Sequence, residues 1–257
     1  MISLVSTFNC RLYGIDQSSI ETKLIKINNS STYDPILNLG RSTFSGKATS
    51  TKIDNQNYQI AAINDNDIIG IRESFHPGST LEVAKINQTN GLMKTIGTYP
   101  YGSYSLVMTY ASKRRLYYNI IESTLYAVNV DTGNLYVNIQ IPNDYLIYAL
   151  DYDSINDRLT ALVYSSSITN GWILTQMIIT TEKEIQFDRI GKTVIPFEKY
   201  LWTTTYIINS NEHSWMAIWS VKNSNASIFI LFNIDTGEII EKWEISSKNL
   251  GNLVCFD

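Results

Sequence analysis

Three carboxylates around one predicted hairpin, Asp151, Asp153 and Asp157, form the densest set of possible metal ligands in the chain. Carboxylate oxygens are the ligands that calcium prefers. Asp and Asn also shape turns by accepting hydrogen bonds from their own backbone, which is the alternative interpretation. A second polar run, from Asn64 to Asp67, has the same two interpretations, but an EF-hand pattern fails at Ile69, where an oxygen ligand would be needed. We therefore expect turn chemistry, no metal site and no cofactor, with calcium as the alternative.

Residue types that commonly carry catalysis are sparse. His76 and His213 are the only two histidines, and neither Cys-x-x-Cys nor His-Glu-x-x-His spacing occurs, which argues against a zinc site. The Gly-x-Ser-x-Gly elbow of serine hydrolases and a Gly-rich phosphate loop are also missing. The sequence thus predicts no catalytic residues and favours a binding protein over an enzyme.

A long predicted connection between two strands, Asn64 to Ser79, supplies the first candidates for partner or ligand binding. It mixes apolar residues with Arg72, Phe75 and His76, and long connections are uncommon unless they bind or cover something. The alternative is that Asp67 to Arg72 only prolongs the preceding strand.

Aromatic residues near predicted loops are the other candidates, because rings among Asn and Ser are typical of protein and carbohydrate surfaces. The alternative for each ring is packing in the core. The candidates are Tyr99, Tyr101, Tyr104, Tyr145, Trp172, Tyr200 and Trp202. Of these, Tyr99, Tyr101 and Trp202 join Arg72, Phe75 and His76 in the predicted binding set.

Composition excludes some partners. A formal charge of -4 and a pI near 5.3 argue against nucleic acid, which needs concentrated Lys and Arg. The densest basic spot, Lys113-Arg114-Arg115, falls in a predicted turn, where we expect a solvated hairpin tip. No apolar run is long enough for a membrane helix, so no membrane partner is expected. The N-terminus lacks the pattern of a signal peptide, which favours the cytoplasm, with a secreted protein whose leader is absent as the alternative.

The elements that must position these residues are short strands. Between Gly102 and Pro142, turn residues separate four apolar runs, which predict a four-stranded antiparallel meander. The runs are Ser105 to Tyr110, Arg115 to Ile121, Thr124 to Val130 and Asn134 to Ile141. Such a unit cannot bury its face alone, and similar units recur along the chain. The turn before the last strand recurs at Ser30 to Asp34, Gln88 to Gly91, Asp131 to Gly133, Thr181 to Lys183 and Asp235 to Gly237. A repeat of roughly 50 residues is typical of propeller blades.

The repeats are related in sequence as well as in pattern. The segment from Leu125 to Gly133 is similar in sequence to the segment from Phe229 to Gly237, and both end in Asp-Thr-Gly. These residues resemble the β-propeller repeat families of the quinoprotein and YVTN type, in which such a turn leads to the outer strand. The resemblance implies an all-β propeller of four-stranded antiparallel blades, most simply five. Six blades and a β-sandwich are the alternatives.

A ring of blades leaves unpaired edges unless its two ends meet. The last residues, Asn252 to Asp257, read as a strand that follows a completed blade, so they should pair with the N-terminal strands and close residues 1 to 257 into one domain. This pairing would put Cys10 and Cys255 in the same blade, in contact or as two separate small side chains.

Three functions remain open at this stage. The first is a non-catalytic scaffold that binds a protein partner on one face of the propeller. The second is a carbohydrate-binding propeller similar to the five-bladed lectins. The third is a hydrolase resembling the calcium-dependent lactonases, with acidic and amide side chains at the mouth of a tunnel.

Overall fold

The computed structural model describes residues 11–16, 23–27, 33–38, 59–62, 67–73, 81–87, 93–99, 107–165, 171–180, 183–196, 200–209, 213–221, 227–245 and 251–256. These residues form strands and turns, and none of them lies in a helix. A helix long and apolar enough to cross a membrane is accordingly not found in these ranges. The predicted all-β class is confirmed.

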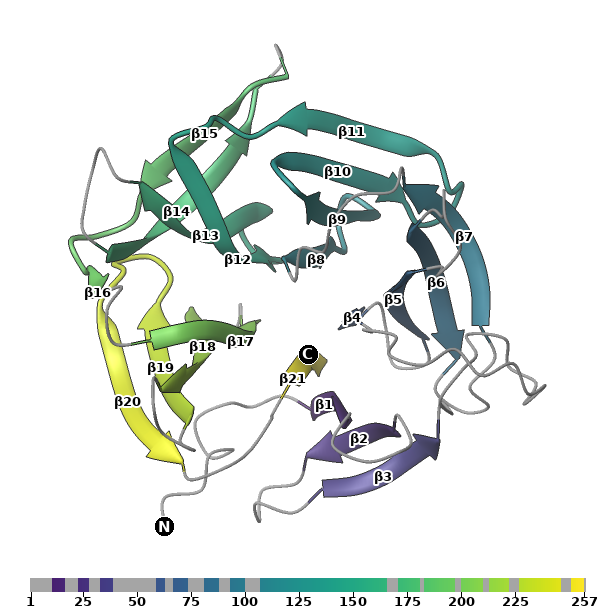
Figure 1. Ribbon diagram of the computed structural model, residues 1–257, viewed down its shortest axis with the longest axis horizontal. Helices are drawn as coiled ribbons and strands as arrows, with labels where there is room; N and C mark the ends of the chain where they lie inside the picture. Colours follow the sequence, from purple (N-terminus) through teal and green to yellow (C-terminus); the bar gives the residue numbers. More distant parts are fainter. Residues whose placement is uncertain are drawn as a thin grey trace. The chain divides into compact units, whose positions relative to one another are not determined.

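The described strands form five antiparallel sheets, each built mainly from strands that follow one another in the chain (Figure 1). The first has the order β21-β1-β2-β3, and the second β4-β5-β6-β7. The other three are β11-β10-β9-β8, β12-β13-β14-β15 and β17-β18-β19-β20. The strands span Arg11–Asp16 (β1), Lys23–Ile27 (β2), Tyr33–Asn38 (β3), Gln59–Ala62 (β4), Asp67–Glu73 (β5), Leu81–Asn87 (β6), Met93–Tyr99 (β7), Met108–Ala111 (β8), Leu116–Ile121 (β9), Thr124–Asn129 (β10), Leu135–Gln140 (β11), Tyr145–Asp153 (β12), Arg158–Ser165 (β13), Gly171–Ile179 (β14), Ile185–Arg189 (β15), Ile195–Pro196 (β16), Tyr200–Asn209 (β17), Ser214–Val221 (β18), Ser227–Asn233 (β19), Ile239–Ile245 (β20) and Gly251–Phe256 (β21).

The predicted insertion from Asn64 to Ser79 is wrong. Asp67–Glu73 is strand β5, which pairs with β4 on one side and β6 on the other, so Arg72 stands opposite Glu82 in a regular ladder. The stretch from Ile68 to Ile71 is rich in β-branched residues, and buried Ile69 shows that the strand contributes to the core. Strand β4, Gln59–Ala62, is therefore the first described strand of its sheet.

The chain's contacts group it into two units. The first consists of Met1–Gly102, Val128–Leu135 and Asn249–Asp257, and the second of Ser103–Ala127 and Tyr136–Lys248. In the first unit, β21 pairs antiparallel with β1, with Leu12 opposite Cys255 and Tyr13 opposite Val254. That this pairing closes the whole chain into one domain stays a prediction, and Cys10 lies outside the described residues.

The second unit has two hydrophobic clusters that meet on β13. Leu159, Ala161 and Val163 of this strand join the first cluster, with side chains from β8–β12, β14 and β15. Leu162 points into the second, which contains Trp172, Trp215 and Phe232. Because successive side chains of a strand point to opposite faces, a strand like β13, which is buried from Leu159 to Val163, is covered on both sides. The resulting core holds the turns at the strand ends in place.

Candidate functional site

Two hairpin turns of the second unit share one backbone design. The β8–β9 turn (residues 112–115) and the β12–β13 turn (residues 154–157) each end in a left-handed residue, Arg115 at φ 56° and Asp157 at φ 51°. In the second of them, Asp153 Oδ1 accepts the backbone N–H groups of Ile155 at 3.1 Å and Asn156 at 3.3 Å. These bonds satisfy donors that the turn itself leaves unpaired. His213, at φ 51°, occupies the equivalent position before β18.

The β19–β20 turn is shaped by Asn233. Its side-chain Oδ1 accepts the N–H groups of Asp235 and Thr236, each at 2.9 Å, and its carbonyl accepts the N–H of Gly237 at 2.8 Å. The β10–β11 turn repeats these bonds around Asn129, as the shared Asp-Thr-Gly sequence predicts. The turn fixes the Asp235 carboxylate at its tip.

Basic residues of the β8–β9 turn contact the β12–β13 turn. Lys113 Nζ donates to the carbonyl of Ile155 at 2.9 Å, and Arg114 Nε donates to Asp157 Oδ1 at 2.7 Å. The same carboxylate oxygen accepts the Tyr152 hydroxyl at 2.7 Å, and the Arg114 guanidinium lies over the Tyr152 ring. Arg114 is therefore held by an ion pair and an aromatic ring at once.

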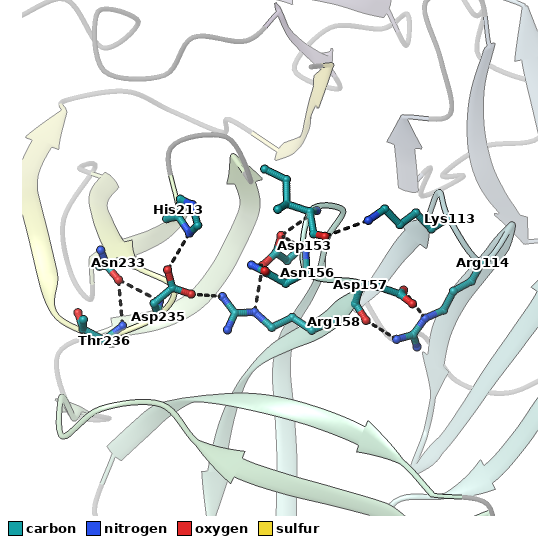
Figure 2. Close-up of polar contacts among 11 residues, drawn as sticks. Lys113, Arg114, Asp153, Asn156, Asp157, Arg158, His213, Asn233, Asp235 and Thr236 are labelled. Atoms are coloured by element: carbon teal, nitrogen blue, oxygen red, sulfur yellow. Dashed lines mark hydrogen bonds and ion pairs between the residues drawn. The ribbon is translucent and has the colours of Figure 1, made fainter.

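Arg158 continues this series of contacts to the next sheet (Figure 2). Its Nε pairs with Asp153 Oδ2 at 3.0 Å, and its Nη2 donates to Asp235 Oδ1 at 2.6 Å. The other oxygen of Asp235 lies 2.7 Å from His213 Nδ1. In Figure 2, these side chains extend in a row from His213 to Arg114. We use the name turn surface for seven residues of these turns, of which Arg158 is largely buried and links the others: Lys113, Arg114, Ile155, Asp157, Arg158, His213 and Asp235.

The contacts shift the ionisation of both bridging carboxylates. A hydrogen bond from Tyr152 and the charge of Arg114 lower the pKa of Asp157, against a smaller opposing effect of burial. Burial on its own would raise the pKa of Asp235, but hydrogen bonds from Arg158 and His213 lower it overall. Burial, followed by the bond to Asp157, raises the pKa of Tyr152, which keeps this hydroxyl a donor. The turn surface consequently carries charges of both signs at neutral pH.

A lowered pKa in the folded state makes stability depend on pH. Ionised Asp157 stabilises the fold above the pKa it has when unfolded, and this contribution is lost as the pH falls through the lowered folded pKa. We expect Asp157→Asn to lower the free energy of unfolding at about pH 7, and the gap to the wild type to vanish near ~pH 2. Urea unfolding at several pH values measures this. A gap that stays constant over the whole range would mean that the charge of Asp157 does not contribute.

The predicted acidic cluster does not converge on one point. Asp151 accepts a hydrogen bond from Thr109 at 2.8 Å, Asp153 caps its own turn, and Asp157 pairs with Arg114. Among the described residues, no group of three or more His, Cys, Asp or Glu side chains is arranged to hold a metal ion. The geometry of Asp153 is the turn chemistry that the sequence predicts.

The six predicted binding residues are only partly placed. Arg72, Tyr99 and Trp202 lie in β5, β7 and β17, where the structure describes the backbone but not these side chains. Phe75, His76 and Tyr101 lie outside the described residues. The binding role of all six stays a prediction.

Two further aromatic candidates prove to be packing residues. Trp172 is 1% exposed and belongs to the second cluster of the core. Tyr145 packs on Phe187, with ring centroids 4.6 Å apart. Both are explained by the alternative interpretation, in which rings fill the core.

Sequence reasoning named most residues of the turn surface but did not bring them together. Lys113 and Arg114 lie in a turn as predicted, but they bind the neighbouring turn and are not simply solvated. Ile155, at the tip of the β12–β13 turn, is 45% exposed and is not among the predicted binding residues. An apolar residue inside a polar turn is the signal that could have identified it.

No protein-family model and no curated protein matches the sequence. Solved structures do match the fold. TolB from Acinetobacter baumannii is similar with a TM-score of 0.58 at 8% identity, covering 95% of this chain and 54% of TolB. An oligogalacturonate lyase from Vibrio parahaemolyticus has a TM-score of 0.48 at 10% identity, covering 89% of this chain and 63% of the lyase. The periplasmic gluconolactonase PpgL from Pseudomonas aeruginosa has a TM-score of 0.46 at 6% identity, covering 96% of this chain and 99% of PpgL.

The likeness to TolB shows the fold alone, because the identity is only 8%. The chain spans about half the length of TolB, since 54% of TolB is covered. With its antiparallel sheets of four strands, one of which carries the short additional strand β16, the chain has a β-propeller fold, and its resemblance to propeller repeats is confirmed at this level. The number of blades in a complete ring stays a prediction.

Proposed function

We propose that this chain is a non-catalytic interaction scaffold whose turn surface binds a protein partner. The observation that carries the proposal is the combination of exposed Ile155 with charged side chains that are fixed by one another in and around the same turn. Arg and exposed apolar residues are the kinds of side chain that protein interfaces use as anchors. Side chains that are fixed before binding lose less conformational entropy when a partner arrives.

Charges of both signs suit a partner surface of mixed charge better than a uniformly acidic or basic one. Lys113 and Arg114 contact the β12–β13 turn that carries Ile155, and Arg158 at the end of this turn links it to Asp235 (Figure 2). A partner that places an acidic group beside the two basic residues and an apolar side chain on Ile155 would match this arrangement. We infer in addition that the repeats are of the quinoprotein and YVTN type, supported by the identical hydrogen bonding of the two Asp-Thr-Gly turns.

A photo-crosslinking residue in place of Ile155 tests the proposal. We expect it to capture a specific protein, because the tip of this turn would be covered by the partner. The same residue in place of Gln186, which is exposed on β15 away from these turns, is the matched control and should capture nothing specific. An identical pattern of captured proteins at both positions would contradict the proposal.

The two other predicted functions have different outcomes in parallel assays. Binding to a glycan array without a crosslinked protein would favour the carbohydrate-binding propeller. Lactone hydrolysis that rises with added calcium would favour the lactonase-like hydrolase.

A further inference from the structure

In each of the five sheets, the fourth strand in chain order stands at one end of the sheet. These strands are β3, β7, β11, β15 and β20. A strand in this position presents unpaired backbone groups, and proteins usually blunt it with charged residues or proline. β3 contains Asp34 and Pro35, and β7 contains Lys94. β15 contains Asp188 and Arg189, and β20 contains Glu241, Lys242 and Glu244.

The exception is β11. Its sequence, Leu-Tyr-Val-Asn-Ile-Gln, has neither charge nor proline. Val137 and Ile139 are buried in the core of the second unit, whereas Tyr136 is 74% exposed. The strand therefore combines a well-anchored inner face with an unprotected edge and a large exposed ring.

We propose that β11 pairs with the β11 strand of a second copy of this chain, which makes the protein a weak symmetric dimer. This surface is separate from the turn surface, so the inference goes beyond the proposed function. A two-fold axis through the strand gives antiparallel pairing of identical sequences.

The sequence of β11 is compatible with itself in this arrangement. If the axis passes through Asn138, Val137 lies opposite Ile139 and Tyr136 opposite Gln140. If it passes through Val137, Tyr136 lies opposite Asn138. In both registers the buried faces of the two β11 strands lie on the same side of the joined sheet. On that side Val137 and Ile139 stand opposite apolar residues, and on the other side Tyr136 shares the surface with Asn138 and Gln140. Neither register places like charges opposite each other, whereas the same pairing of β20 about Lys242 would oppose two lysines.

A single added strand buries less than the roughly 800 Å² per partner of a standard interface. The dimer should accordingly form at high protein concentration and dissociate on dilution. Sedimentation equilibrium over a concentration series measures this directly. A monomer at every concentration up to the solubility limit would overturn the proposal.

Charge variants separate strand pairing from any effect on folding. The double variants Tyr136→Lys with Asn138→Lys, and Tyr136→Glu with Asn138→Glu, should each be monomeric, because like charges would face each other in either register. An equal mixture of the two should dimerise, since opposite charges then pair. Gln186→Lys on the already charged strand β15 is the control and should dimerise like the wild type. Variants that dimerise alone, or a mixture that stays monomeric while the wild type dimerises, would contradict pairing through β11.

Discussion

Replacing Gly133 with alanine is expected to lower the free energy of unfolding by about 2–4 kcal/mol, because it combines backbone strain with overpacking. Gly133 has φ +76°, in the left-handed region that alanine rarely adopts. An added Cβ would lie 1.7 Å from the carbonyl oxygen of Ile96 and 3.8 Å from the Cα of Gly97. Since the obstacle is backbone of a neighbouring strand, it cannot move aside as a flexible side chain could.

The matched control for Gly133→Ala is Lys183→Ala. Lys183 occupies a left-handed position, φ 61°, in the β14–β15 turn, and its side chain is exposed. That turn already accepts a Cβ, so this substitution should change stability by less than about 0.5 kcal/mol. Urea unfolding followed by tryptophan fluorescence gives both values. Equal effects of the two substitutions would show that the close approach of Gly133 to Ile96 is not a constraint.

Replacing Arg158 with methionine is expected to cost about 3 kcal/mol, the typical result of removing one partner of a buried ion pair. The Asp153 side chain is fully buried, and Arg158 is only 15% exposed. Methionine keeps much of the packing volume but leaves the Asp153 carboxylate without a counter-charge. Its hydrogen bonds from Ile155 and Asn156 remain and limit the loss.

Three further variants separate the buried pair from its exposed extension. Asp235→Asn should cost less than about 1 kcal/mol, because this carboxylate is about half exposed and its ion pair is screened by solvent. In the variant with both Arg158→Met and Asp153→Asn, the combined loss should be smaller than the sum of the single losses. Chemical unfolding of the wild type, Arg158→Met, Asp153→Asn and the double variant provides the cycle. Additive losses would mean that Arg158 does not stabilise the fold through its pair with Asp153.

Strand positions could be predicted well from the sequence wherever apolar runs ended at turn residues. In the sheet β8–β11, the four predicted runs mark strands that the structure contains, because short polar turns and Asp131-Thr132-Gly133 interrupt them clearly. The prediction for the second sheet was wrong because it placed strand β5, Asp67–Glu73, inside one long connection from Asn64 to Ser79. Local pattern also gave no sign of β16, whose two residues pair with Gly171 and Trp172.

The turn surface could not be predicted because its contacts join residues far apart in the chain. Arg158 meets Asp235 only when two hairpin ends of different sheets are brought side by side. The basic run at Lys113-Arg114-Arg115 was identified from composition, but composition does not show that Asp157 lies within 2.7 Å of Arg114. The capping role of Asp153 was predictable, since it depends on its own neighbours in the sequence.

The affinity of the crosslinked partner for the Ile155→Asp variant tests the proposed function most directly. The side chain is exposed, and the backbone bonds of Ile155 to Asp153 and Lys113 do not involve it, so the variant should unfold at the same urea concentration as the wild type. We expect the dissociation constant, measured by titration calorimetry, to rise by about tenfold or more, which corresponds to a loss of about 1.4 kcal/mol of binding free energy. An unchanged dissociation constant for a folded variant would show that the turn surface is not where the partner binds.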